Sequence, residues 1–175
     1  HCRDCDADHA VFRRGVIGQG SFFFSVRLVP TSGFSHSTFA NVAVVDSADY
    51  GVEIQTGSPT LTAVDVINST DAAISQGPAA EPDYRSVSAS GNAGDHIEVA
   101  SATYSQDHTW DFGGFPAHIV GNIRVNGAET TLQVRPGNII KLGTTIAIES
   151  STGASDRGSL IAVGTATEPI VCTSI

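Results

Sequence analysis

The first nine residues hold the densest group of ligand-type side chains in the sequence. Cys2 and Cys5 form a C-x-x-C pair, and His1 and His9 add two imidazole rings. Thiolates and imidazoles are the usual zinc ligands, so one interpretation is a zinc site on His1, Cys2, Cys5 and His9. Structural zinc sites commonly draw ligands from two separate knuckles, and the sequence offers one. Disulfides or solvated polar residues are therefore the interpretation that we prefer.

The same segment carries alternating acidic residues at Asp4, Asp6 and Asp8, as at the start of a calcium-binding loop. Position six of that loop should be Gly and position twelve Glu, but the sequence has His9 and Gly15 there. The spacing excludes an EF-hand and leaves only loose calcium binding. We predict no resident cofactor, with zinc, copper and calcium as the alternatives.

The three cysteines, Cys2, Cys5 and Cys172, lie near the two ends of the sequence and none lies between them. An odd number leaves one thiol over unless it pairs with another chain. Two arrangements stay open: a clasp within one chain between Cys5 and Cys172, or a disulfide from Cys2 or Cys5 of one chain to Cys172 of the next.

A second group of interest lies between Tyr104 and Phe115. It contains the single tryptophan, together with the candidate contact residues Tyr104, Asp107, His108, Trp110 and Phe112. Aromatic rings beside polar side chains in a loop suit stacking on a sugar or contact with a partner. The same residues equally suit a plug in the protein core.

Composition narrows the function classes. Acidic residues outnumber basic ones 18 to 9, the net charge is −9, and Lys141 is the one lysine. An acidic chain of this kind is a poor nucleic-acid binder. No apolar run is long enough for a membrane span. The sequence lacks a G-x-S-x-G motif and other catalytic motifs, so we predict that the protein is not an enzyme. The first residue, His1, and the absence of methionine suggest a processed, secreted product.

Short alternating segments predict an all-β fold. Strands are expected over 39–46, 50–56 and 60–67, and a long loop over 68–94. Asn126-Gly127 predicts a β-hairpin in which Arg124 faces Glu129. No internal repeat is evident. We therefore expect an antiparallel β-sandwich or jelly roll of about eight to ten strands over residues 20–175, preceded by an N-terminal arm over residues 1–19.

Three consecutive aromatic residues follow the expected arm. Phe22, Phe23 and Phe24 cannot all point to one face of a strand, so at least one ring lies on the outer face. Such a ring needs a cover, and we predict an assembly contact with an arm or a partner chain.

Three resemblances bear on function. An N-terminal His1 on a β-sandwich resembles the copper site of lytic polysaccharide monooxygenases, although the other histidines lack that family's usual preceding glycine. The segments TLQVRPGNIIKLGTTIAIES and GSLIAVGTATEPI resemble small phage head-decoration proteins. The paired cysteines, LQVRPGNIIKLGTT and Cys172 resemble jelly-roll subunits of bacterial endospore appendages, whose arms cross-link neighbours by disulfides.

Together these features predict a structural subunit of an extracellular filament or a virion surface. Its partners would be copies of itself or a capsid protein. A secreted carbohydrate-binding module is the first alternative, and a copper or zinc protein is the second.

Overall fold

The structure is a computed structural model, and it describes residues 11–17, 26–28, 37–127, 129–143, 148–150 and 158–175. The described residues form strands and connecting turns, and none of them lies in a helix. The strand pairs are parallel, and the strands follow one another as the turns of a β-solenoid, about 5 turns in all. No helix among the described residues is long and apolar enough to cross a membrane.

The expected antiparallel sandwich or jelly roll is therefore wrong, although the all-β class is correct. The error has a physical cause. A solenoid strand has one face toward the core and one toward solvent, which produces the same alternation of apolar and polar residues as a half-solvated antiparallel strand. Alternation thus identifies the strands but does not show which strands they pair with.

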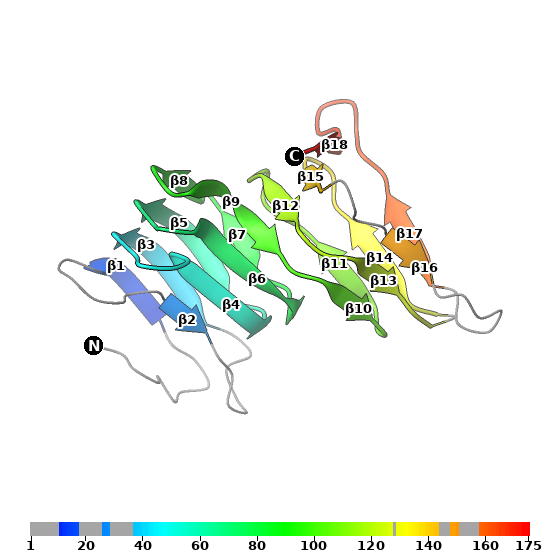
Figure 1. Cartoon of the computed structure of the whole chain (residues 1–175), viewed down its shortest axis with the longest axis horizontal. Helices are drawn as coiled ribbons and strands as arrows, with labels where there is room; N and C mark the ends of the chain where they lie inside the picture. Colours follow the sequence, from blue (N-terminus) through cyan, green and yellow to red (C-terminus); the bar gives the residue numbers. More distant parts are fainter. Residues whose placement is uncertain (1–10, 18–25, 29–36, 128, 144–147, 151–157) are drawn as a thin grey trace. The chain divides into compact units, whose positions relative to one another are not determined.

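The chain separates into two compact units, His1–His96 and Ile97–Ile175. In the first unit, two sheets stack successive turns of the chain (Figure 1). One sheet has the order β1-β3-β5-β7, with β8 also paired to β5, and the other contains β2-β4-β6. Part of the expected N-terminal arm is strand β1. The strands are β1 (Val11–Ile17), β2 (Val26–Leu28), β3 (Thr38–Val45), β4 (Val52–Gly57), β5 (Thr60–Ile67), β6 (Ala72–Ala80), β7 (Asp83–Arg85) and β8 (Ser88–Ser90).

Each turn in this unit adds one layer of strands, here called a rung, and the same sequence positions stack from rung to rung. Phe39 pairs with Leu61, and Leu61 with Tyr84, so the sequence advances by roughly 22 residues per rung. All three side chains are at most 5% exposed and form one inward-facing row of the core. The unit therefore has the internal repeat that the sequence analysis did not find.

The bends between strands are also stacked. Asp46, Asn68 and Gly91 follow paired strand ends and all have positive φ, between 57° and 72°. The side-chain amide of Asn68 donates to Asp46 Oδ1 over 3.2 Å. A Cβ on Gly91 would lie 2.5 Å from Asn68 Oδ1, so glycine is required there for space as well as for φ.

A neighbouring side chain, that of Asn92, completes this corner. Its Oδ1 accepts a hydrogen bond from Ser69 N over 2.7 Å, and its amide donates to Val66 O over 3.0 Å. The corner therefore satisfies backbone groups between successive rungs. The expected loop over 68–94 is instead this corner together with strands β6, β7 and β8.

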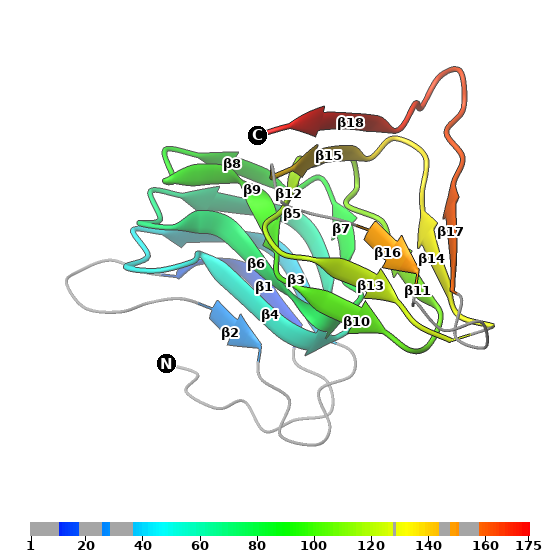
Figure 2. The ribbon, with the colours of Figure 1, turned by 45° about the vertical axis from the view of Figure 1, so that its right-hand side comes forward.

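The second unit has three sheets around one core (Figure 2). The end of β9 pairs with β12, which continues to β15 and β18; the other two sheets are β10-β13-β16 and β11-β14-β17. The strands are β9 (Gly94–Val99), β10 (Ala102–Tyr104), β11 (His108–Trp110), β12 (Ala117–Ile119), β13 (Ile123–Val125), β14 (Thr131–Val134), β15 (Ile139–Leu142), β16 (Ile148–Ser150), β17 (Ser159–Ala162) and β18 (Val171–Ser174).

The predicted Asn126-Gly127 hairpin is wrong. Strands β13 and β14, on either side of this turn, belong to different sheets and do not pair with each other. Arg124 lies in register with Thr103 of the preceding rung and Glu149 of the next, not with Glu129. Gly127 does have positive φ, 127°, but it serves a corner of the solenoid and not a reversal of direction.

A buried tyrosine in the first unit gives the fold a measurable pH dependence. Tyr84 is 5% exposed and donates a hydrogen bond to Gln76 Oε1 over 3.1 Å, while Gln76 donates to Ala80 O. Burial raises the pKa of Tyr84 far above its ordinary value. The unfolded chain releases this proton near pH ~10 and the native chain keeps it, so stability falls as pH rises through that range.

We predict that Tyr84→Phe flattens the alkaline loss of stability. At neutral pH the variant should lose about 1 kcal/mol with the hydrogen bond to Gln76. Above about pH 9, its free energy of unfolding should fall less steeply than that of the wild type, because Phe has no proton to release. Urea unfolding followed by circular dichroism at several pH values measures both slopes. Equal slopes would contradict the prediction.

Candidate functional site

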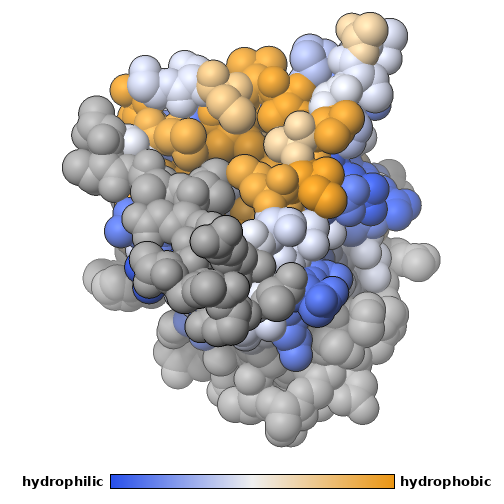
Figure 3. Space-filling view, turned by 90° about the vertical axis from the view of Figure 1, so that its right-hand side faces the viewer, coloured by the Kyte–Doolittle hydropathy of each residue, from blue (hydrophilic) through white to orange (hydrophobic). Residues whose placement is uncertain are grey.

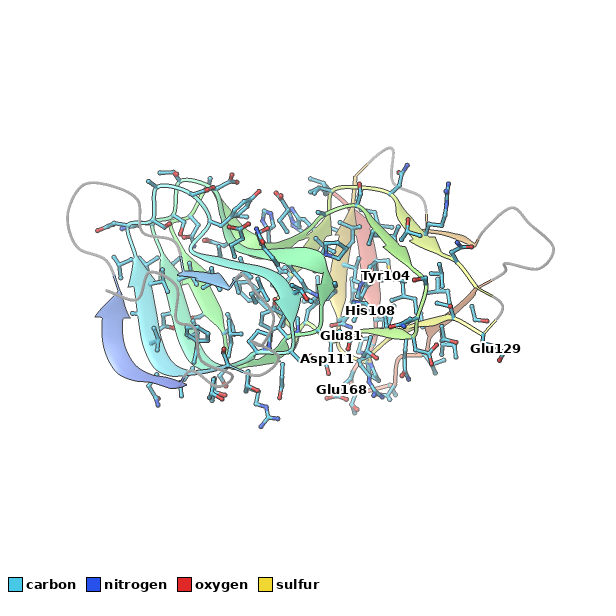
Figure 4. The ribbon with its side chains drawn as sticks, turned by 90° about the horizontal axis from the view of Figure 1, so that it is seen from below. Glu81, Tyr104, His108, Asp111, Glu129 and Glu168 are labelled. Carbon is cyan, nitrogen blue, oxygen red and sulfur yellow. The ribbon has the colours of Figure 1, made fainter. Side chains whose placement is uncertain are left out.

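The aromatic group identified in the sequence forms part of the core of the second unit. Tyr104, Trp110 and Phe112 are at most 6% exposed, and His108 is 7% exposed. The rings of Tyr104 and His108 stack with centroids 4.1 Å apart, and these residues lie side by side in Figure 4. Trp110 Nε1 donates to Tyr104 Oη over 3.1 Å. These contacts join strands β10 and β11 within one rung.

This placement corresponds to the core plug, one of the three interpretations of these residues. A sugar stacks on a ring face that solvent can reach, and these four residues are at most 7% exposed. The nearby carboxylate is also used internally, because Asp107 Oδ1 accepts a hydrogen bond from Thr131 N over 2.8 Å. The described part of this group thus organises the solenoid core.

Asn138 holds this core to the following rung. Its side chain is fully buried, and its Oδ1 accepts a hydrogen bond from Phe112 N over 2.9 Å. Its amide donates to Trp110 O over 2.9 Å and to Arg135 O over 3.0 Å. One side chain thereby bonds to three backbone groups, of which Trp110 O also accepts a hydrogen bond from Arg135 N.

Most of the other candidate residues lie outside the described residues. These are His1, Cys2, Cys5 and His9 of the possible metal or cross-linking group, and Phe22, Phe23 and Phe24 of the possible assembly contact. Among the residues that the structure does describe, no group of three or more His, Cys, Asp or Glu side chains could hold a metal ion. Cys172 is described, and its thiol is free and exposed on β18.

Cys172 lies in the last described rung of one core row. It lies in register with Ile140 of β15, which lies in register with Ala117 of β12. Ala117 and Ile140 are at most 3% exposed, whereas Cys172 is exposed. The thiol therefore occupies a core-type position on a rung that no further rung covers in this structure.

The neighbouring strand shows the same change. Leu132 of β14 is fully buried, but Leu160, its register partner in β17, is 48% exposed. Val171 at the start of β18 is 45% exposed, and Ile161 is 46% exposed. Figure 3 shows apolar surface gathered on this side of the molecule. We call β17, β18 and residues 163–170 between them the C-terminal edge.

The C-terminal edge is also an edge in the hydrogen-bonding sense. Strand β17 is the last strand of the sheet β11-β14-β17, and β18 is the last strand beyond β15. Their described backbone hydrogen bonds run to one side, as from Ser159 N to Thr130 O and from Val171 N to Asn138 O. Unpaired edge groups next to exposed apolar side chains form a template for strand addition.

A polar hollow lies elsewhere on the second unit. It has a volume of about 290 Å³ and is lined by Ser101, Ala102, Thr103, Asn122 and Arg124. No aromatic side chain lines it. It therefore offers hydrogen-bonding groups without the stacking platform that sugar binding commonly uses.

Cys172 was a candidate residue from the sequence, whereas Leu160, Ile161 and Val171 were not. The signal for Leu160 is its place in a core row, because it follows Leu132 and His108 in register. Successive rungs of this unit have unequal lengths, from Ala117 to Ile140 and then to Cys172, so no fixed period aligns these positions.

No protein-family model matches this chain, and no curated protein or solved structure matches it significantly.

We predict that Asn138→Ala destabilises the second unit by about 2–5 kcal/mol, because three buried hydrogen bonds are lost and Phe112 N and Arg135 O lose the Asn138 partner without replacement. Trp110 is the single tryptophan, and its fluorescence reports unfolding next to the site of the change. Asn122→Ala is the matched control, since the Asn122 side chain is exposed, and it should change stability by less than about 0.5 kcal/mol. Equal effects of the two substitutions would show that the Asn138 contacts do not stabilise the fold.

Proposed function

We propose that this protein is a non-enzymatic structural subunit that assembles with copies of itself through the exposed edges of its sheets. The observation that carries the proposal is the change along one core row, from Leu132, fully buried, to Leu160, 48% exposed. A filament or a virion surface, outside the cell, is the setting that we infer for such a subunit.

The energetic argument follows from the solenoid itself. Each inner rung buries its apolar row against the rungs on both sides, whereas Leu160, which continues the row of Leu132, is about half exposed. Full burial of one such side chain contributes about 1.5–3 kcal/mol, so covering the exposed half of Leu160 would gain roughly 0.8–1.5 kcal/mol before new backbone hydrogen bonds form. Binding costs of several kcal/mol oppose this gain, so hydrogen bonding between edges has to contribute.

The electrostatic character of the edge supports the same proposal. The chain as a whole carries a net charge of −9, which opposes close approach of two copies. From Ser159 to Ile175 the sequence has a single charged side chain, Glu168. Self-association through this surface therefore avoids most of the repulsion between copies.

Disulfides are a second element of the proposal. The Cys172 thiol is free and exposed, as a cross-link to a neighbouring chain requires. Its partner in a neighbour would be Cys2 or Cys5. A covalent link would strengthen contacts that the sheet edges form first.

We predict that the intact chain self-associates in a concentration-dependent way in reductant, and that a covalent ladder forms under oxidising conditions. Sedimentation velocity up to about 100 µM detects association of micromolar affinity. Denaturing electrophoresis with and without reductant, followed by peptide mapping, identifies the linked cysteines. A chain that stays monomeric in sedimentation and gives a single band in both gels would refute the proposed function.

A further inference from the structure

The parallel strand order limits how a second copy can cover the C-terminal edge. Strand pairs in the described residues are parallel, so each unit has a direction from earlier to later rungs. A copy that docks through its own first rung continues this parallel pairing. A copy that docks through its own last rung would have to pair β17 or β18 in the antiparallel sense.

The first rung of the chain offers matching strands. In the described residues, β1 pairs with β3 and β2 pairs with β4, and each is the end strand of its sheet. Strands β1 and β3 pair on both sides of Asn41, which has positive φ. Arg13 pairs with Ala40 before it, and Gly15 pairs with Val42 after it. Thus β1 follows the same bent path as an inner rung. We call β1 and β2 the N-terminal edge.

The sequence charges of the two edges are opposite in sign. From Val11 to Leu28 the chain contains three arginines and no acidic residue. The C-terminal edge, from Ser159 to Ile175, has one charged side chain, Glu168. Contact between unlike edges is therefore attractive, whereas contact between two N-terminal edges brings the arginines of both copies together.

We propose that the C-terminal edge binds the N-terminal edge of a second copy, so that parallel strand pairing continues from one chain into the next. This inference rests on the proposed function and names the two surfaces that meet. Because the contact joins different surfaces, it leaves one free edge of each kind after every addition. Assembly is then head to tail and grows into a filament or closes as a ring.

A mixing experiment with two edge variants tests the polarity of assembly. Leu160→Asp places a charge on the C-terminal edge and leaves the N-terminal edge intact. The triple change Arg13→Glu, Arg14→Glu and Arg27→Glu reverses the charge of the N-terminal edge and leaves the C-terminal edge intact. Each variant alone should remain monomeric in reductant, and an equimolar mixture should form a complex of two chains that grows no further.

The controls separate edge effects from loss of folding. Val120→Asp charges an apolar side chain of similar exposure, 47%, outside both edges, and it should assemble like the wild type. Circular dichroism and thermal melting of each variant should match the wild type. Ile161→Asp replaces Leu160→Asp if the latter melts early, since Ile161 is also about half exposed in β17.

A charge-swap pair tests the electrostatic part. Arg27→Glu alone and Glu168→Lys alone should each raise the dissociation constant about tenfold, and the double variant should recover most of the wild-type affinity. The inference is overturned if the wild type assembles but the N-terminal variant still pairs with itself, or if neither edge variant changes assembly. Those results would leave self-assembly in place, whereas a monomeric wild type would refute the proposed function as well.

Discussion

The structure depends on parallel, in-register pairing between successive rungs. In such a stack, the backbone groups of one rung are satisfied by the rungs on either side, and equivalent side chains form continuous rows. Corners need separate solutions, which Asn92 and Asn138 supply by bonding to backbone atoms of neighbouring turns. A last rung has a neighbour on one side only. The same pairing that stabilises the interior therefore leaves an end of the stack able to pair with a further strand.

Local sequence patterns predicted several strands well, and β5 lies at the residues expected for it, Thr60–Ile67. They failed at pairing, because a two-residue alternation is the same whether the neighbouring strand is parallel or antiparallel. Asn126-Gly127 misled for a related reason: its positive-φ glycine suits a solenoid corner as well as a hairpin. The stacked corners, Asp46-Ser47 and Asn68-Ser69, were the readable sign of a repeat.

The candidate site was predictable only in part. The clustering of Tyr104, His108 and Trp110 was evident in the sequence. That these side chains face inward was not, because it depends on a core that lies between three sheets. Cys172 was noticed as a thiol near the end of the sequence. That it occupies a core-type position, in register with Ile140, requires the pairing of β15 with β18. Spacing alone could not give this because rung lengths differ.

The stacked corner of the first unit also affects how the protein should be produced. Asn68-Ser69-Thr70 is an acceptor sequence for N-linked glycans in eukaryotic secretory cells. In the folded chain, the Asn68 amide nitrogen donates to Asp46 Oδ1. Asn68 Oδ1 lies so close to Gly91 that no side chain fits there. A glycan attached during synthesis would occupy that nitrogen and stand beside Asp46, at the corner of the preceding rung. Expression in a host without this modification therefore preserves the corner.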